Sequence, residues 1–229
     1  MPGFRLCLSM GGEDPKKIQT KLREADRLGA DLIELRVDHL RNIDTEVLKD
    51  EVSPYLDRCI LTCRSREEGG EFQGSEEERI SILESLIELS PAYIDLELAT
   101  IKAEEHLVHK AREGGVSAII SWHSFEETPE AHTLKMKASD TLEFGQIGKI
   151  VTTAKSLWDN VRVLRLYQRF DEGKLVAFAM GQIGVVSRIL APLLGSPLMY
   201  VSLPKEAVAP GQLTIEEFRG FLDVLREQD

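Results

Sequence analysis

The sequence has little cysteine, no excess of basic residues and no long apolar run. Only three of its 229 residues are cysteine, namely Cys7, Cys59 and Cys63, and each lies in an apolar stretch typical of a strand. An odd number of cysteines in such settings indicates reduced thiols in a cytoplasmic protein. Cys59 and Cys63 could form half of a metal site, but no second Cys or His pair completes a tetrahedral set. We therefore interpret them as packing residues and expect no bound metal.

The charge balance and the opening segment argue against a nucleic-acid-binding, a membrane-associated and a secreted protein. The chain carries 28 basic and 39 acidic residues, a net charge of -11. Nucleic acids and anionic membranes attract proteins through a positive field, so neither is an expected partner. The first apolar run is only a few residues long before glycines and charges follow, too short for the core of a signal peptide or a membrane span. An anionic substrate would need local arginines to outweigh the negative field of the chain.

What the sequence does have is a regular alternation of short apolar runs and longer amphipathic stretches. The expected strands are residues 4–10, 32–38, 58–64, 92–98, 116–124, 146–154, 175–181 and 197–203, and each is followed by an expected helix. Eight such units average roughly 29 residues, the size of a compact βα repeat. Strands alternating with helices imply a parallel sheet, and eight units predict closure into an α/β fold, the (β/α)8 TIM barrel, as a single domain over residues 1–229.

An open, doubly wound sheet is the main alternative fold. It would usually carry a glycine-rich phosphate turn after its first strand, and the Gly11-Gly12 pair there lacks that pattern. Local signals agree with the expected helices. Ser75 followed by Glu78 predicts a capping box, and Thr128-Pro129 predicts the start of the fifth helix.

Several expected strands carry charges where a barrel interior is normally apolar. Side chains alternate along a strand, so Glu34 and Arg36 lie on the same face of their strand. Asp95 and Glu97 likewise lie on the same face of theirs. The inward-facing set holds three carboxylates and three cations: Glu34, Asp95, Glu97, Arg36, Arg64 and Lys149. The set is formally neutral, as a buried cluster must be to avoid unpaired charge. Asp95 taken alone fits a structural ion pair, whereas the whole cluster at the carboxyl ends of strands indicates catalysis.

Lys149 and His123 are the candidate reactive residues. Lys149 lies in mid-strand between QIG and IVTTA, where lost hydration and neighbouring cations favour a neutral amine that can attack a carbonyl. His123 taken alone fits a hydrogen-bonded core histidine, but beside a buried lysine and acids it becomes a plausible proton-transfer group. His106 and His109 are interleaved with Glu and Lys, which marks a solvated helix face.

Seven short segments occur in an order that resembles the type I 3-dehydroquinate dehydratase family. They are ELRVD (34–38), TCRSREEGG (62–70), YIDLEL (93–98), SWHSF (121–125), KIVTTAKS (149–156), MGQIGVVSR (180–188) and APGQ (209–212). The resemblance covers essentially the whole chain. It implies a (β/α)8 barrel, usually a homodimer, that needs no metal or organic cofactor and converts 3-dehydroquinate in the shikimate route.

The resemblance also implies residue roles. Lys149 matches the Schiff-base lysine, His123 the general acid/base, and Glu68 the acid that orients and charges that histidine. The substrate-binding positions it implies are Glu34 and Arg36 for hydroxyls with Arg64 beside them, Arg188 for the carboxylate, Met180 as an apolar wall, and Gln212 from a loop that closes over ligand. Val208 departs from the serine found there in many members, so one hydroxyl contact of the lid is missing or supplied differently.

Two other functions remain open at this stage. Another Schiff-base barrel, such as a sugar-phosphate aldolase, would share Lys149 but would require a phosphate site near the last two strands, and GQIGVVSR lacks a glycine-rich cradle. A non-catalytic barrel that binds small acids would require the Lys149, His123 and Glu68 set to be coincidental.

Overall fold

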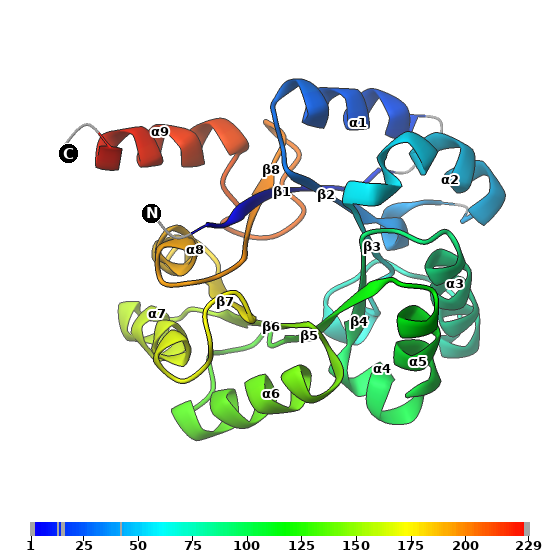
Figure 1. Cartoon of the computed structure of the whole chain (residues 1–229). Helices are drawn as coiled ribbons and strands as arrows, with labels where there is room; N and C mark the ends of the chain where they lie inside the picture. The colour runs from blue at the N-terminus through cyan, green and yellow to red at the C-terminus, as the bar shows by residue number, and fades with distance from the viewer. Residues whose placement is uncertain (1–2, 13, 15–16, 42, 227–229) are drawn as a thin grey trace.

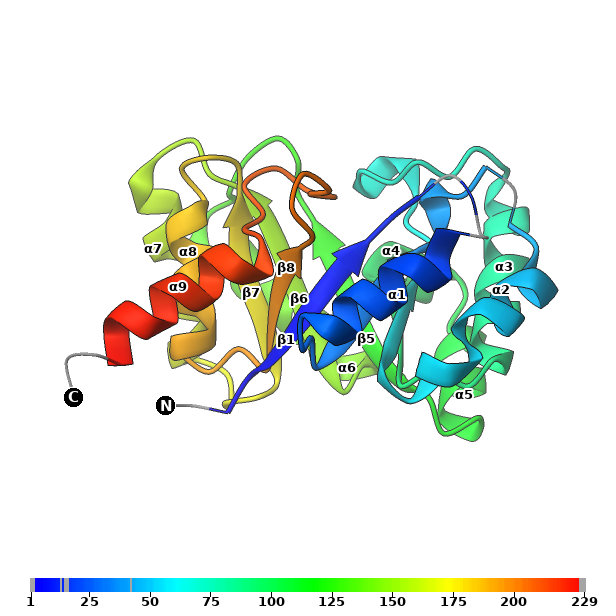
Figure 2. The same ribbon diagram turned by 90° about the horizontal axis from the view of Figure 1, so that it is seen from above.

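The computed structural model describes residues 3–12, 14, 17–41 and 43–226. Its strands are β1 (Arg5–Met10), β2 (Leu32–Arg36), β3 (Cys59–Thr62), β4 (Tyr93–Glu97), β5 (Ser117–His123), β6 (Ile147–Thr153), β7 (Leu175–Met180) and β8 (Leu198–Ser202). They pair in parallel in the order β7-β6-β5-β4-β3-β2-β1-β8. Figure 1 shows them as a ring seen end-on with helices outside, and Figure 2 shows the same ring from the side. The predicted (β/α)8 barrel is confirmed.

The two ends of the sheet meet through loops. Gly181 N after β7 donates to Pro210 O in the loop after β8 at 3.2 Å, and Gly173 N before β7 donates to Gly195 O before β8 at 2.9 Å. These contacts hold β7 near β8 where the ladder itself is interrupted. The loop after β8 is thereby fastened to the mouth of the barrel.

The helices are α1 (Ile18–Arg27), α2 (Thr45–Val52), α3 (Glu76–Glu88), α4 (Leu98–Ala103), α5 (His106–Glu113), α6 (Ala131–Phe144), α7 (Leu157–Leu164), α8 (Val185–Leu193) and α9 (Ile215–Arg226). The predicted capping box at Ser75 and Glu78 is confirmed. The predicted cap at Thr128 is wrong, because α6 begins later with Glu130 as its N-cap. Thr128 instead hydrogen-bonds to Thr152 and to Thr153 O on β6.

One expected helix is two. The stretch from 101 to 115 contains the end of α4 and the whole of α5, because Glu104 leaves the helical region with φ -129° and ψ 61°. Short 3-10 turns follow two of the strands that carry candidate site residues: η2 (Val37–His39) directly follows β2, and η4 (Arg66–Glu68) follows β3. Both turns lie at the carboxyl ends of strands, where barrel enzymes place their chemistry.

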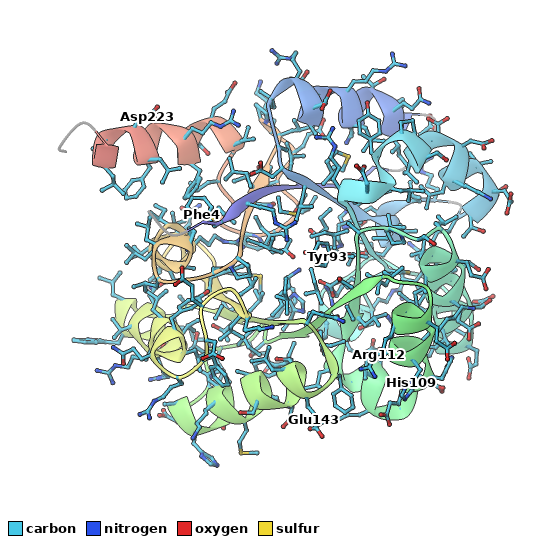
Figure 3. All side chains as sticks on the ribbon, in the orientation of Figure 1. Phe4, Tyr93, His109, Arg112, Glu143 and Asp223 are labelled. Carbon is cyan, nitrogen blue, oxygen red and sulfur yellow. The ribbon has the colours of Figure 1, made fainter. Side chains whose placement is uncertain are left out.

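The core has one part outside the ring and one part inside it. Outward-facing residues such as Leu35, Leu96 and Ile150 pack against the helices, as the alternation predicts. The inside is filled by apolar side chains toward the amino ends of the strands, among them Leu32, Ile60, Ile119, Ile147, Val176 and Leu198. Tyr93 points into the ring in Figure 3, while His109 and Arg112 lie outside on α5. Across the described residues, no helix has the length and apolar character needed to cross a bilayer.

Candidate active site

A cavity of about 140 Å³ opens at the carboxyl ends of the strands. The nine residues to which the resemblance assigns a role all line it: Glu34, Arg36, Arg64, Glu68, His123, Lys149, Met180, Arg188 and Gln212. The other two inward charges expected from the sequence, Asp95 and Glu97, do not line it. The nine residues come from β2, β5, β6, β7, α8 and the loops after β3 and β8. Residues separated by up to 178 positions in sequence therefore meet at one site.

Lys149 lies buried in mid-β6 between two carboxylates. Its Nζ donates to Asp95 Oδ2 at 3.0 Å and to Glu34 Oε1 at 3.3 Å. The sequence suggested neighbouring cations, but the ion pairs of Lys149 are with anions, because Glu34 and Asp95 point into the ring from β2 and β4. The face of the Tyr200 ring lies 4.3 Å from Nζ, a cation–π contact in a desolvated setting.

His123 and Glu68 form the second pair. Glu68 Oε2 lies 2.8 Å from His123 Nδ1 and accepts a further hydrogen bond from the His123 backbone N–H at 3.1 Å. Two contacts to one oxygen fix the ring and leave Nε2 for another partner. Burial, with the charges of Arg64 and Lys149, lowers the pKa of His123 well below its usual value. Burial raises the pKa of Glu68 to about 8, and its two contacts with His123 orient the imidazole ring.

Arg64 is surrounded by carboxylates and a hydroxyl that contact its guanidinium. Its guanidinium donates to Asp95 Oδ1 at 2.8 Å and to Ser121 Oγ at 2.6 Å, and lies 3.2 Å from Glu97 Oε1. Glu97 also accepts from Arg79 on α3 at 2.6 Å. Four ionisable groups from β4, α3 and the loop after β3 thus form a continuous buried network that reaches the cavity at Arg64. Asp95 belongs both to this network and to the pair with Lys149.

Arg188 is a buried cation with few contacts that offset the loss of hydration of its charge. It is 2 % exposed, its guanidinium lies 4.2 Å above the Phe178 ring, and Nη2 donates to Pro210 O at 3.3 Å. Among the described residues its Nε has no hydrogen-bond partner, and no carboxylate pairs with its guanidinium. Burial lowers its pKa to about 9. An anionic ligand group in the cavity would relieve this cost.

The loop after β8 forms part of the cavity wall. Gln212 uses its amide within the loop, donating to Val201 O at 3.1 Å and accepting from Val208 N at 3.0 Å. Val208 lines the cavity, so an aliphatic surface stands where many members present serine. Met180 contributes the apolar wall that the resemblance implied. Tyr200 and Phe178 also line the cavity, and sequence reasoning missed both because their apolar strands read as ordinary core.

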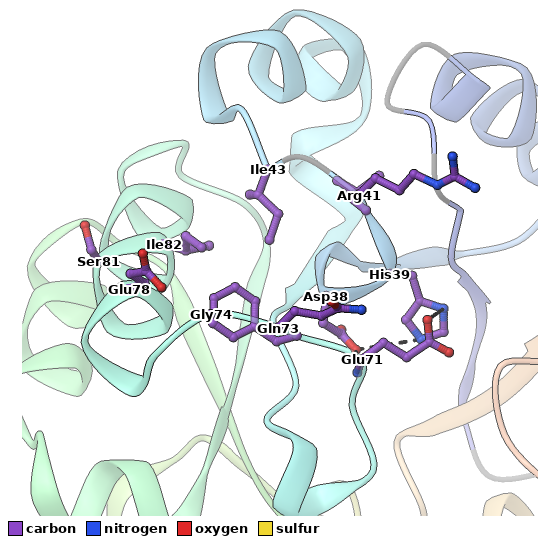
Figure 4. Close-up of a pocket in the computed structure, with 12 residues that line it drawn as sticks. Asp38, His39, Arg41, Ile43, Glu71, Gln73, Gly74, Glu78, Ser81 and Ile82 are labelled. Carbon is purple, nitrogen blue, oxygen red and sulfur yellow. Dashed lines mark hydrogen bonds and ion pairs between the residues drawn. The ribbon is translucent and has the colours of Figure 1, made fainter.

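A second hollow, of about 640 Å³, lies beside the site between η2 and α3 (Figure 4). Its lining includes Asp38, His39, Glu71, Phe72 and Gln73. None of the nine predicted site residues lines it. Across the described ranges, no group of three or more His, Cys, Asp or Glu side chains is arranged to hold a metal ion.

The fold and the cavity define a class of protein: a (β/α)8-barrel enzyme with a buried lysine and a carboxylate-oriented histidine at the carboxyl ends of its strands. The family model described as type I 3-dehydroquinase matches residues 6–229. The chain belongs to the type I 3-dehydroquinase family, and it is a hydro-lyase.

Relatives and solved structures agree. A 3-dehydroquinate dehydratase of Thermococcus onnurineus is 44% identical over 198 residues, covering 86% of this chain and 88% of the relative. One of Pyrococcus abyssi is 38% identical over 211 residues, covering 92% and 94%. The crystal structure of 3-dehydroquinate dehydratase from Geobacillus kaustophilus matches with a TM-score of 0.87 at 26% identity, covering 99% of this chain and 92% of that one. The Aquifex aeolicus structure matches with a TM-score of 0.83 at 31% identity, covering 96% and 98%.

Proposed function

We propose that residues 1–229 form one catalytic barrel that removes water from 3-dehydroquinate to give 3-dehydroshikimate, in the shikimate route to aromatic compounds. The proposal rests on family membership and on one observation. Lys149 and the His123–Glu68 pair share a cavity with Arg188, a buried cation that lacks a carboxylate partner within the described residues. A keto acid offers a carbonyl to the lysine and a carboxylate to the arginine.

In the proposed reaction the Lys149 amine adds to the ketone. His123 transfers protons while the carbinolamine loses water, leaving a protonated imine. The imine withdraws electrons from the adjacent carbon, and neutral His123 removes a proton there to give an enamine. The enamine expels the β-hydroxyl, which leaves as water after protonation by His123. Hydrolysis of the conjugated imine then frees the product and the lysine.

The remaining lining residues suit substrate binding. Arg188 takes the carboxylate through its guanidinium fork, while Glu34 and Arg36, with Arg64 beside them, take ring hydroxyls. Met180 packs against the apolar side of the ring. Gln212 turns from its loop contacts to the ligand as the loop after β8 closes, and Val208 adds no hydroxyl to this closure. No organic cofactor or metal enters these steps.

We also propose a homodimer in the cytoplasm. Helices α7 and α8 pack side by side (Figure 1), and large apolar side chains are exposed on them and on the residues that flank α8: Leu157, Trp158, Val161, Ile183, Val186, Leu190 and Leu194. No exposed residue of α8 carries a charge. Two copies at -11 each repel, so an uncharged face is where they can meet with two-fold symmetry. The three buried free cysteines fit a reducing compartment.

The dimer is tested by sedimentation velocity. Trp158, 74 % exposed, is changed to Glu, and Val224 on α9, 58 % exposed, is changed to Glu as the control. We expect a dimer for the wild type and for Val224→Glu, and a monomer for Trp158→Glu. A monomeric wild type would refute the homodimer.

The chemistry is tested by mixing the protein with 3-dehydroquinate and borohydride and mapping the modified peptide by mass spectrometry. A stable adduct on Lys149 is expected. In the presence of substrate alone, His123→Ala should accumulate covalent adduct, because addition precedes the proton removal it can no longer perform. No adduct in a folded wild-type protein would overturn the Schiff-base mechanism and favour a binding role.

A further inference from the structure

Asp38 lies just outside the cavity yet contacts two parts of the site. It follows β2 within η2, and its side chain is 0% exposed. It lines the second hollow, between η2 and α3, and not the cavity that contains Lys149. Figure 4 shows it near Glu71 in the lining of this second hollow. The family resemblance gives this residue no role.

The Asp38 carboxylate accepts four hydrogen bonds. Oδ1 accepts from Arg36 Nε at 2.9 Å and from Arg64 N at 3.2 Å. Oδ2 accepts from Arg36 Nη2 at 2.7 Å and from Glu71 N at 3.1 Å. A carboxylate has about four acceptor positions, so its capacity is used. Burial raises the pKa of Asp38, but its hydrogen bonds and the Arg36 charge outweigh burial and leave the net pKa lowered.

The two backbone amides are the ends of one loop. Residues 64 to 71 turn tightly, with Gly70 N donating to Ser65 O at 2.7 Å, and Gly69 at a φ of 76°. A side chain at Gly70 would collide with the Arg64 carbonyl. This loop carries Glu68, the carboxylate that holds His123. Tying both ends of the loop to one carboxylate therefore limits where Glu68 can lie.

We propose that Asp38 is a positioning residue that fixes the Arg36 guanidinium and the Glu68 loop relative to each other. One carboxylate thereby aligns the substrate-hydroxyl contact with the proton-transfer pair. The bidentate contact leaves Nη1 of Arg36 as its group for a ligand, and the loop ends fix the distance from Glu68 to His123. This inference rests on the proposed dehydratase function.

A purely structural ion pair is the competing explanation, and the test separates the two. Asp38→Asn keeps the shape but replaces one acceptor oxygen by an NH2 group, which then faces a donor from Arg36, Arg64 or Glu71. Asp31→Asn is the matched control. Asp31 Oδ2 also accepts a backbone amide, Leu6 N at 2.8 Å, but at the opposite end of the barrel.

For Asp38→Asn we expect kcat with 3-dehydroquinate to fall roughly 10- to 100-fold, as for a small misplacement of catalytic groups. KM should rise because Arg36 loses the carboxylate that aligns it for the substrate. The pH of the acid limb of kcat/KM should shift because Glu68 moves away from His123. Borohydride should still trap an adduct on Lys149, which Asp38 does not contact. Asp31→Asn should match the wild type in all four readouts.

A lower melting temperature for Asp38→Asn with unchanged kcat, KM and pH profile would overturn the proposal. If the asparagine variant does not fold, Asp38→Glu carries the test, since it keeps the charge and acceptors but displaces them by one methylene. A kcat for Asp38→Glu equal to that of the wild type would then overturn it. A wild-type protein with neither turnover nor adduct would refute the proposed function instead.

Discussion

Lys149 and Asp95 form a buried ion pair across the inside of the barrel, with Nζ 3.0 Å from Oδ2. Neither side chain exceeds 6% exposure. The carboxylate holds the amine at the floor of the cavity and is itself held by Arg64. Lys149, the proposed nucleophile, is therefore held by the same ion-pair network that balances charge inside the barrel.

Lys149→Met should abolish turnover and adduct formation while the protein stays folded. Asp95 keeps Arg64 and Ser121 as partners and Glu34 keeps Thr62, so neither carboxylate that pairs with Lys149 is left without a donor. Turnover and circular dichroism check this, with Lys102→Met on the surface of α4 as the control. Near wild-type turnover would show that the mechanism is not covalent through this residue.

The acid limb of kcat/KM should lie below pH 6.5. Burial and the charges of Arg64 and Lys149 lower the pKa of His123, so the neutral base persists as the pH falls. A pH profile of kcat/KM from 4.5 to 9 measures it. A limb centred at or above pH 6.5 would contradict the inferred environment of the imidazole.

Glu68→Gln should become relatively more stable than the wild type as the pH rises. The pKa of Glu68 is raised from 4.5 to about 8 on folding, so its contribution is fully present below pH 4.5 and is lost as the pH rises to about 8. Glutamine has no such titration. Urea unfolding at several pH values gives the difference between variant and wild type. A difference independent of pH would show that Glu68 is not buried as described.

Arg79→Met should destabilise the protein by about 1–3 kcal/mol, because Glu97 Oε2 loses a buried charged donor while Glu97 Oε1 keeps Arg64 and the Ser65 N–H. Arg79 is 1% exposed and donates to Glu97, Thr100 and the Cys63 carbonyl. The double variant with Glu97→Gln should recover part of the loss. Urea unfolding of the single and double variants tests the coupling, and a loss below about 1 kcal/mol would indicate that water replaces the guanidinium.

Tyr200→Phe should leave stability unchanged or raise it, by up to about 1–3 kcal/mol, because it removes a buried hydroxyl that has no hydrogen-bond partner among the described residues. The ring that faces Lys149 is kept. Thermal and urea unfolding measure the effect. A clear loss of stability would mean that the hydroxyl has a partner after all.

Much of the fold could be predicted from local pattern. Each of the eight predicted strands is present and is one to three residues shorter than predicted, because the flanking residues belong to loops, 3-10 turns or, at Leu98, the next helix. Period-two alternation correctly sent Glu34 and Lys149 inward and Leu35 and Ile150 outward. The split of α4 from α5 was not predicted, since the amphipathic pattern runs through both and only the backbone at Glu104 separates them.

The sequence by itself determined the eight βα units, the inward charges and, through its motifs, the family. Only the tertiary structure decided which charges meet. Glu68 reaches His123 across 55 positions and Lys149 reaches Glu34 across 115, and Asp38 joins Arg36 to both ends of the Glu68 loop. Residue type and periodicity set the face on which a side chain lies. Its partner depends on strand register and ring closure, which are properties of the whole sheet.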